Sequence, residues 1–311
     1  MRDRSVIADL SRRTQSLLRD GRFRGLLQGL GAAVILAILA YALYRNRDQF
    51  QQASFSMDYT LAAVGLGLWA SGYLLLAFGW TLVLNGLGNP VPWWHGSRVW
   101  LLSQGLKYIP GSVVYAFGRV VLAQEAGIRA APAAMGLALE SLLALATALL
   151  VFLVLFPLGF LGELSIPLIA AALLGLAVVV ASLPPVLTKL SGIWAKTGGL
   201  ALSYRRLAFL CGFYIMTWFV VGLACYVSLK SLGPEFNLGY LQVLGLYAVS
   251  WAAGLVAVFA PGGVGVRDGL LILLLSHFVP LPLAAMGAAV LRVQTLVVEG
   301  VLAFVALKLQ R

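Results

Sequence analysis

Two breaks in the apolar sequence carry the residue types best suited to bind an anion. Pro110-Gly111 precedes Arg119, and Pro261-Gly262-Gly263-Val264-Gly265 precedes Arg267 and Asp268. Proline blocks helix continuation, and glycine permits a sharp turn. A helix that begins after such a break directs free N–H groups and its positive dipole end at the space beside it. A nearby guanidinium adds donors for a phosphate or carboxylate. The alternative is a pair of ordinary interfacial loops whose arginines extend to lipid headgroups.

Ionisable residues inside apolar runs form a second candidate group. Glu140 lies in the run 131–156, and Arg292 and Glu299 lie seven residues apart in the run 283–307. An unpaired charge facing lipid costs several kcal/mol, so these side chains are expected to face protein. We predict that Glu140 and Arg292 pair across the bundle, with Glu299 further along the same wall. A purely structural ion pair explains them equally well.

Composition places the chain in a membrane. Of its 311 residues, 61% are hydrophobic and 11% are charged, whereas a soluble domain has roughly 25% charged residues. Uncharged runs such as 26–44 and 60–84 reach the roughly 20 residues that a helix needs to cross the hydrocarbon core. The formal net charge of +11 is then explained by basic cytoplasmic loops, and a nucleic-acid partner is excluded. No spacing of residues indicates a metal or a cofactor.

The pattern predicts an all-α, polytopic bundle. Residues 1–25 form a basic cytoplasmic tail, residues 26–308 one transmembrane domain, and residues 184–206 an interfacial linker within it. The stretches 93–126 and 262–279 are predicted as broken or re-entrant elements, because they are short or mix charges with apolar turns. Seven crossings are predicted at 26–44, 60–84, 131–156, 164–183, 207–229, 239–260 and 283–307.

Basic residues predict the orientation. The linker 184–206 contains four Lys and Arg and no acid, whereas the loop 157–163 has no base. The linker and the N-terminus are therefore expected on the cytoplasmic side of the cell (inner) membrane. The side of the C-terminus is left open, because it depends on whether the two broken stretches cross.

The chain resembles itself at a shift of 151 residues. Over residues 100–154 there are 13 identities, which include Trp100 with Trp251, both Pro-Gly pairs and the tetrapeptide 133–136 with 284–287. We predict two repeats with cores at about 93–156 and 244–307, each containing a broken or re-entrant helix. Four spans between the Pro-Gly pairs would make the repeats parallel. An odd number would make them inverted.

The quoted motifs resemble the flippase-like membrane family named for the transmembrane region of lysylphosphatidylglycerol synthase. The first signature is matched by Lys107-Tyr108-Ile109-Pro110-Gly111, Phe117-Gly118-Arg119, Glu125-Ala126-Gly127-Ile128 and Glu140, and the second by residues 261–268. Asp268 stands where a glutamate is expected, and Ser112 where many members have glycine. The resemblance implies a site at the matched residues, with Lys107 and Glu125 added to those above. The chain resembles a free-standing member of this family, because no aminoacyl-transfer domain follows the last span.

The resemblance implies a lipid translocase. The two predicted breaks agree with this, because their helix N-termini and arginines are suited to bind an anionic headgroup. The expected substrate is a polar, anionic phospholipid or a polyprenyl-phosphate-linked glycolipid, and a lipid-modifying enzyme or glycosyltransferase is a possible partner. The headgroup would enter a cavity between the repeats and meet the helix ends near the Pro-Gly pairs, with Arg119 and Arg267 screening its phosphate. One alternative is a non-transporting scaffold for glycolipid or envelope-lipid synthesis. The other, an integral-membrane transferase, would need paired acids, a His-Asp pair or a metal cluster.

Overall fold

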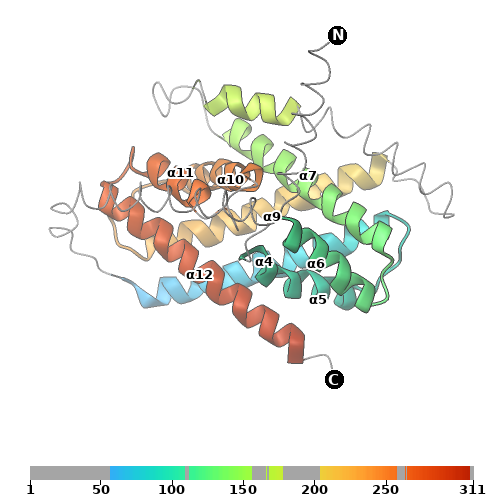
Figure 1. Cartoon of the computed structure of the whole chain (residues 1–311). Coiled ribbons are helices and arrows are strands. Elements are labelled where there is room, and N and C mark those ends of the chain that lie inside the picture. Colours follow the sequence, from blue (N-terminus) through green and yellow to red (C-terminus); the bar gives the residue numbers. More distant parts are fainter. Residues whose placement is uncertain are drawn as a thin grey trace, which may run out of the picture.

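The computed structural model is a bundle of packed helices (Figure 1). It describes residues 57–108, 112–155, 166, 168–177, 204–257, 263 and 265–308. Every regular element in these ranges is helical, which confirms the predicted all-α class. A short helix also covers Leu168–Ala177. The labelled elements are α4 (Tyr59–Gly86), α5 (Trp93–Ser103), η1 (Gln104–Tyr108), α6 (Ser112–Glu125), α7 (Ala130–Leu155), α9 (Tyr204–Lys230), α10 (Tyr240–Val256), α11 (Val266–Leu275) and α12 (Leu281–Lys308).

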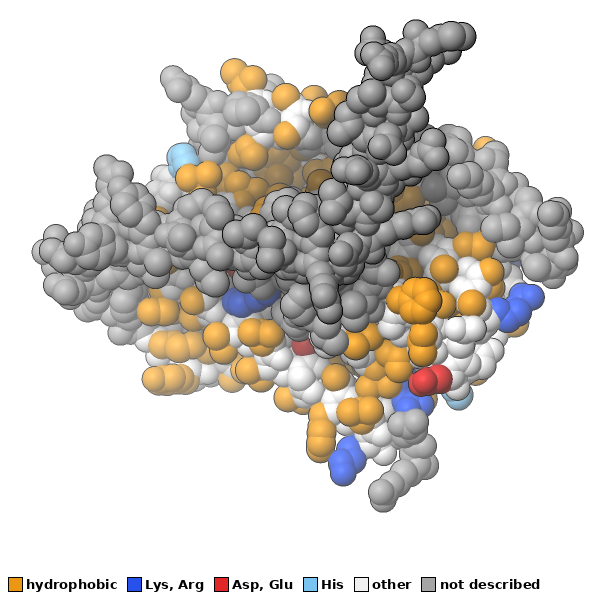
Figure 2. All heavy atoms as spheres, in the orientation of Figure 1, with side chains coloured by type: hydrophobic (Ala, Val, Ile, Leu, Met, Phe, Trp, Pro, Cys, Tyr) orange, Lys and Arg blue, Asp and Glu red, His pale blue; other side chains and the backbone are white. Residues whose placement is uncertain are grey.

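Four of the described helices are long and apolar enough to cross a membrane: α4, α7, α9 and α12. They match four of the predicted crossings. The coloured part of the face in Figure 2 is mostly hydrophobic with few charges, as a lipid-facing surface requires. Helix α10 has 17 residues and ends at Val256, earlier than the predicted crossing 239–260. The tail 1–25, the first crossing and most of the linker 184–206 lie outside the described residues.

Glycines on α4 allow it to pack tightly against α9. A Cβ atom at Gly72 would lie 3.0 Å from Val221 Cγ2, and one at Gly79 would lie 2.9 Å from Phe213 Cε1. Gly65, seven residues earlier, faces Ser228, about two turns further along α9. The contacts run in opposite directions along the two helices, so α4 and α9 are antiparallel, as Figure 1 shows. Inside lipid the hydrophobic effect does not drive helices together, so the close van der Waals packing that small residues allow is what holds α4 against α9.

A buried polar link joins the same two helices to α12. The Ser228 hydroxyl donates to Gln294 Oε1 at 2.5 Å, and Gln294 Nε2 donates to the Ala62 carbonyl at 3.2 Å. These groups have no water to bond in hydrocarbon, so each needs a partner from a neighbouring helix. The link fixes the position of α12, the helix that carries Arg292 and Glu299.

Short helices lie on both sides of the two predicted breaks. Helix α5 continues into η1, and α6 begins at Ser112; α10 ends at Val256, and α11 begins at Val266. Gly263 and Gly265 have φ angles of 70° and 85°, which L side chains rarely adopt, so the chain turns sharply before α11. Pro110, Gly111, Pro261 and Gly262 lie outside the described residues. The re-entrant character of these segments therefore stays a prediction.

Candidate functional site

Arg119 of α6 and Glu140 of α7 form a buried ion pair. Glu140 Oε2 accepts a hydrogen bond from Arg119 Nη1, and Oε1 accepts one from Trp100 Nε1 at 2.5 Å. Arg119 Nε donates to Ser103 Oγ at 2.9 Å, and Nη2 donates to the Tyr115 hydroxyl. All three guanidinium nitrogens and both carboxylate oxygens thus have partners. The pair is neutral and internally satisfied, which is the condition under which buried charges are tolerated.

Aromatic rings seal this pair from its surroundings. The Arg119 guanidinium carbon lies 4.9 Å from the ring centre of Tyr115, 5.5 Å from that of Trp100 and 5.6 Å from that of Trp80. These are cation–π distances. Arg119 is only 1% exposed. The hydrogen-bond partners of the Arg119 side chain come from three helices: Ser103 from α5, Tyr115 from α6 and Glu140 from α7.

The predicted Glu140–Arg292 pair is wrong. Glu140 bonds to Arg119, and Arg292 lies within ion-pair distance of Asp268. The prediction assumed that equivalent positions of two repeats face one another. Instead, the helix that follows each break packs beside the long helix that comes after it in the chain. Each long helix therefore meets a charge from its own neighbouring short helix.

A second ion pair joins elements that are far apart in the sequence. Lys107 Nζ of η1 lies 2.6 Å from Glu299 Oε1 of α12 and 3.3 Å from Gln104 Oε1. The Tyr73 hydroxyl of α4 donates to the same Glu299 oxygen. The Lys107 side chain is 22% exposed, whereas that of Glu299 is 5% exposed. This pair is therefore partly open, unlike that of Arg119.

Arg267 is buried without a carboxylate partner among the described residues. Its Nη2 donates to the Tyr247 hydroxyl at 2.5 Å, and its guanidinium carbon lies 4.9 Å from the ring centre of Tyr247. Its Nε is buried with no hydrogen-bond partner in the described part of the chain. Arg267 is 8% exposed. Among the described residues its side-chain hydrogen bond thus goes to a neutral phenol, while the Asp268 carboxylate acts on it electrostatically without an ion pair.

A close approach of backbones places Arg267. A Cβ atom at Gly254 of α10 would lie 2.7 Å from the Arg267 Cβ and 3.5 Å from the Gly263 Cα. Glycine at residue 254 therefore lets the turn and the start of α11 lie against α10. Gly265 caps α11 without a side-chain hydrogen bond, and Asp268 lies in its first turn. A negative charge there is favoured by the helix dipole.

Five charged residues of the described part of the chain gather around these contacts, and we call them the central cluster. Arg292 Nε of α12 lies 3.9 Å from Asp268 Oδ2 of α11. Lys107 is within electrostatic range of Arg267 and Arg292 as well as Glu299, and Arg267 is within range of Tyr73. The central cluster thus contains three basic residues and two acidic ones, and its formal charge is +1. Its members are Lys107, Arg267, Asp268, Arg292 and Glu299.

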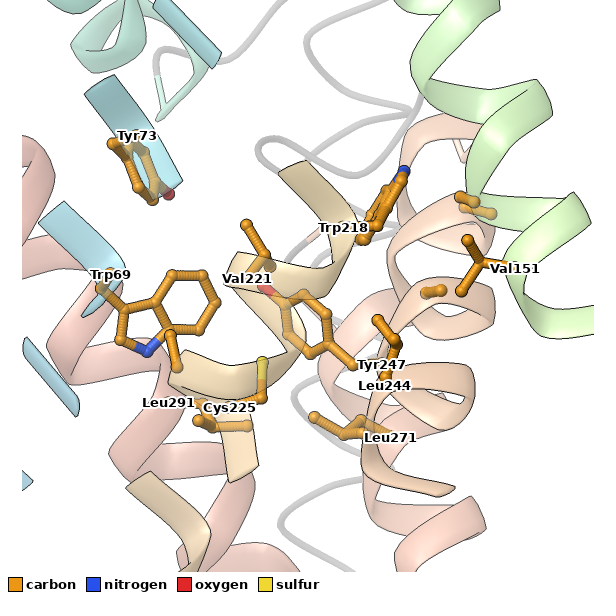
Figure 3. Close-up of a cluster of buried hydrophobic side chains, with 14 of the residues drawn as sticks. Trp69, Tyr73, Val151, Trp218, Val221, Cys225, Leu244, Tyr247, Leu271 and Leu291 are labelled. Atoms are coloured by element: carbon orange, nitrogen blue, oxygen red, sulfur yellow. The ribbon is translucent and has the colours of Figure 1, made fainter. Parts of the chain in front are cut away.

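Aromatic side chains pack against one another around the central cluster. Trp69 packs edge-on against Tyr247 with ring centres 5.6 Å apart, and Tyr73 packs against Trp100 at 5.9 Å. Figure 3 shows the Trp69 and Tyr247 rings beside each other, with Trp218 on the far side of Tyr247. Tyr73 and Tyr247 each present a hydroxyl to a charged group from within this apolar packing. Their rings fix where Glu299 and Arg267 can lie.

Sequence reasoning named all five members of the central cluster, but not how they are joined. Among the other predicted site residues, Glu125 is exposed at the end of α6, and Gly263 and Gly265 form the turn before α11. Tyr73, Tyr247, Trp100 and Ser103 were missed. Tyrosine and tryptophan are common in membrane proteins, so their presence alone carries no signal. Only the packing shows that their polar atoms meet charges.

The fold and the site describe a helical membrane protein with charged groups gathered inside its bundle. Residues 28–303 match the family model described as the lysylphosphatidylglycerol synthase TM region. The chain therefore belongs to this family, which confirms the resemblance drawn from the two signatures. No curated protein matches the chain significantly. Family membership indicates a membrane function connected with lipids.

Proposed function

We propose that this protein is a non-enzymatic lipid translocase that moves an anionic lipid across the membrane. The headgroup enters the bundle and binds at the central cluster, while the hydrocarbon chains stay in the bilayer. The observation that carries the proposal is Arg267. It is a deeply buried guanidinium that forms no ion pair with a described carboxylate and has a buried Nε without a hydrogen-bond partner among the described residues, and it lies at the start of a short helix after a break. Such a charge is costly in a membrane and is retained for a function.

Helix bounds support the proposed repeats. Helix α7 begins at Ala130 and α12 at Leu281, which is 151 residues later and equals the shift found in the sequence. In each case a broken segment and a short helix come before the long helix. Figure 1 draws α7 and α12 running in roughly opposite directions, as the corresponding helices of an inverted pair do. Lipid or substrate sites of transporters commonly lie between such halves.

The expected cargo is an anionic phospholipid or a polyprenyl-phosphate-linked glycolipid. Both have a phosphate diester, which suits a guanidinium and an ammonium group. We place the protein in the cell (inner) membrane with its N-terminus in the cytoplasm, where enzymes of lipid or glycan assembly would supply the cargo. Arg119 is assigned a structural role in this proposal, because Glu140 already neutralises it.

Reconstitution into liposomes tests the proposal. Vesicles contain phosphatidylglycerol with a fluorophore on one acyl chain, and dithionite quenches the fluorophores in the outer leaflet. Lipid translocation lets the quench proceed past one half, whereas protein-free vesicles stop there. Arg267→Gln is expected to slow the second phase at least about tenfold. Arg205→Gln, an exposed arginine at the start of α9, is the matched control and should behave as the wild type.

Two results would reject the proposal. Wild-type vesicles that quench like protein-free ones, over a panel of anionic and glycosylated lipids, would favour a non-transporting scaffold. Translocation that is unchanged in Arg267→Gln would reject the central cluster as the headgroup site. Purified protein should first show a single symmetric peak in detergent, so that a lost activity is not a lost fold.

A further inference from the structure

The ends of the described helices gather on two faces of the bundle. Helix α4 begins where α9 ends, because the Asp58 amide donates to the Ser231 carbonyl at 2.7 Å. Helix α12 begins at the same place, since a Cβ atom at Gly287 would lie 2.7 Å from Leu229 Cδ2, near the end of α9. One face therefore has the starts of α4 and α12 together with the end of α9.

The other face has the ends of α4 and α12. There the end of α12 meets the start of α5, where Arg98 Nε donates to the Ala306 carbonyl at 3.0 Å. The start of α7 meets the end of α4, since a Cβ atom at Gly136 would lie 3.0 Å from Leu84 Cδ2. Helix α9 also starts at this face, because it is antiparallel to α4.

The described charges at the helix ends divide unequally between the two faces. The face with the ends of α4 and α12 has five basic residues and one acid, and we call it the basic face. The other, which we call the opposite face, has one basic residue and two acids. On the basic face these are Arg98, Arg129, Arg205, Arg206, Lys308 and Glu125. On the opposite face they are Lys230, Asp58 and Glu235.

The segment around the first break leaves the basic face and returns to it. Helix α6 is antiparallel to α5 and η1, because Arg119 Nε donates to Ser103 Oγ at 2.9 Å and Gly118 lies against Leu106. Helix α5 starts at the basic face. Helix α6 ends there too, since only residues 126–129 separate it from the start of α7.

The segment around the second break does the same at the opposite face. Helix α10 starts beside the end of α9, where the rings of Tyr240 and Tyr226 lie 6.0 Å apart. Helix α11 begins against Gly254, near the inner end of α10, where an added Cβ atom would lie 2.7 Å from Arg267 Cβ. Residues 276–280 then connect α11 to the start of α12 at the opposite face.

We propose that the basic face lies against the headgroups of the cytoplasmic leaflet, so that α5 and α6 enter the membrane from the cytoplasm and α10 and α11 enter from the other side. Basic residues gather at the cytoplasmic ends of membrane helices, and anionic headgroups there attract them. Exposed rings of Trp93 and Tyr204 on the basic face, and of Tyr59 on the opposite face, suit two membrane–water interfaces. The end of α12 is then cytoplasmic, and each leaflet has its own broken segment. This goes beyond the proposed function, because it holds whether or not lipid moves.

Single cysteines at the ends of the two segments test the proposal. Spheroplasts and inside-out vesicles that contain the full chain are treated with a membrane-impermeant maleimide. The wild type, whose Cys211 and Cys225 lie within α9, sets the background. Each variant must first give a single symmetric peak in detergent. The exposed reporter positions are His95→Cys and Gln124→Cys for α5 and α6, and Asn237→Cys and His277→Cys for α10 and α11. Glu125→Cys and Glu235→Cys replace a reporter that does not fold.

Asn237→Cys and His277→Cys should be labelled in spheroplasts and lose the label in inside-out vesicles. His95→Cys and Gln124→Cys should show the reverse, and Lys308→Cys at the end of α12 should follow them. If the two ends of one segment are labelled from different sides, that segment crosses the membrane and the proposal is overturned.

Two other results would also overturn the proposal. Labelling of all four reporters from one side would reject entry from opposite sides. Labelling of each pair from one side, but with the sides exchanged, would reject the cytoplasmic assignment of the basic face. Because labelling needs no lipid movement, a failure of the translocase proposal in the dithionite assay leaves each of these outcomes unchanged.

Discussion

Two groups of charges lie within the described part of this bundle, and they are built differently. In the first, Arg119 and Glu140 neutralise each other, and Trp100, Ser103 and Tyr115 occupy the remaining bonding positions. In the second, the central cluster, three basic residues meet two acids. One of its arginines has a neutral phenol as its hydrogen-bond partner.

The difference separates a structural ion pair from the proposed binding site. The Arg119–Glu140 pair joins α6 to α7, which follow each other in the chain, and it is sealed by rings. The Lys107–Glu299 pair joins η1 to α12 and is partly exposed. A charge that is fully bonded inside the protein has nothing left to offer a ligand, whereas an unbalanced one does. The comparison therefore predicts large stability effects in the first group and small ones in the second.

Glu140→Ala should have the largest effect on stability. It leaves Arg119 buried without a counter-charge, which costs about 3–5 kcal/mol. Unfolding in detergent, followed by circular dichroism, measures the change. The double variant Arg119→Met, Glu140→Leu removes both charges and should recover most of the loss. A single variant as stable as the wild type would show that the Arg119–Glu140 pair does not stabilise the fold.

Trp100→Phe tests the same group through one hydrogen bond. It keeps most of the ring packing but removes the indole donor to Glu140 Oε1. Losing a hydrogen bond to a charged group costs about 1.5–3 kcal/mol. Trp93→Phe is the control, because Trp93 is 63% exposed and should change stability little. Equal effects of the two substitutions in an unfolding titration would argue against a special role for Trp100.

Gly254→Ala tests the placement of Arg267. The added Cβ would lie 2.7 Å from the Arg267 Cβ, so α11 has to move away from α10. We expect a loss of about 1–2 kcal/mol from overpacking, together with weaker phosphatidylglycerol binding. Gly67→Ala on α4 meets no atom within 4 Å and serves as the matched control. Unaltered lipid binding in Gly254→Ala would mean that the position of α11 does not control the site.

Arg267→Gln should change stability least. It removes a buried charge that forms no ion pair among the described residues, so the free energy of unfolding is expected to stay within about 1 kcal/mol of the wild type or to rise. Lipid binding and translocation should nevertheless fall strongly. A large loss of stability with normal lipid binding would contradict the proposed difference between the two groups and make Arg267 a structural residue.

The sequence predicted the residues of the site better than their partners. Glu299, Arg292, Lys107, Arg267 and Asp268 were all recognisable as charges in or beside apolar runs. The Glu140–Arg292 pairing failed because it relied on repeat equivalence, which says nothing about which faces of two helices meet. Contacts such as Tyr73 with Glu299, 226 residues apart in the chain, have no local pattern that could reveal them.

Composition and apolar run length alone determined that this chain is a helical membrane protein, because a helix in hydrocarbon must be long, apolar and internally hydrogen-bonded. The signature residues alone indicated its family. Tertiary structure decided which charges cancel. Arg119 and Arg267 look alike in the sequence, since each follows a Pro-Gly break. Packing gives a carboxylate to Arg119 and a phenol to Arg267, and that choice depends on distances between helices that no local pattern encodes.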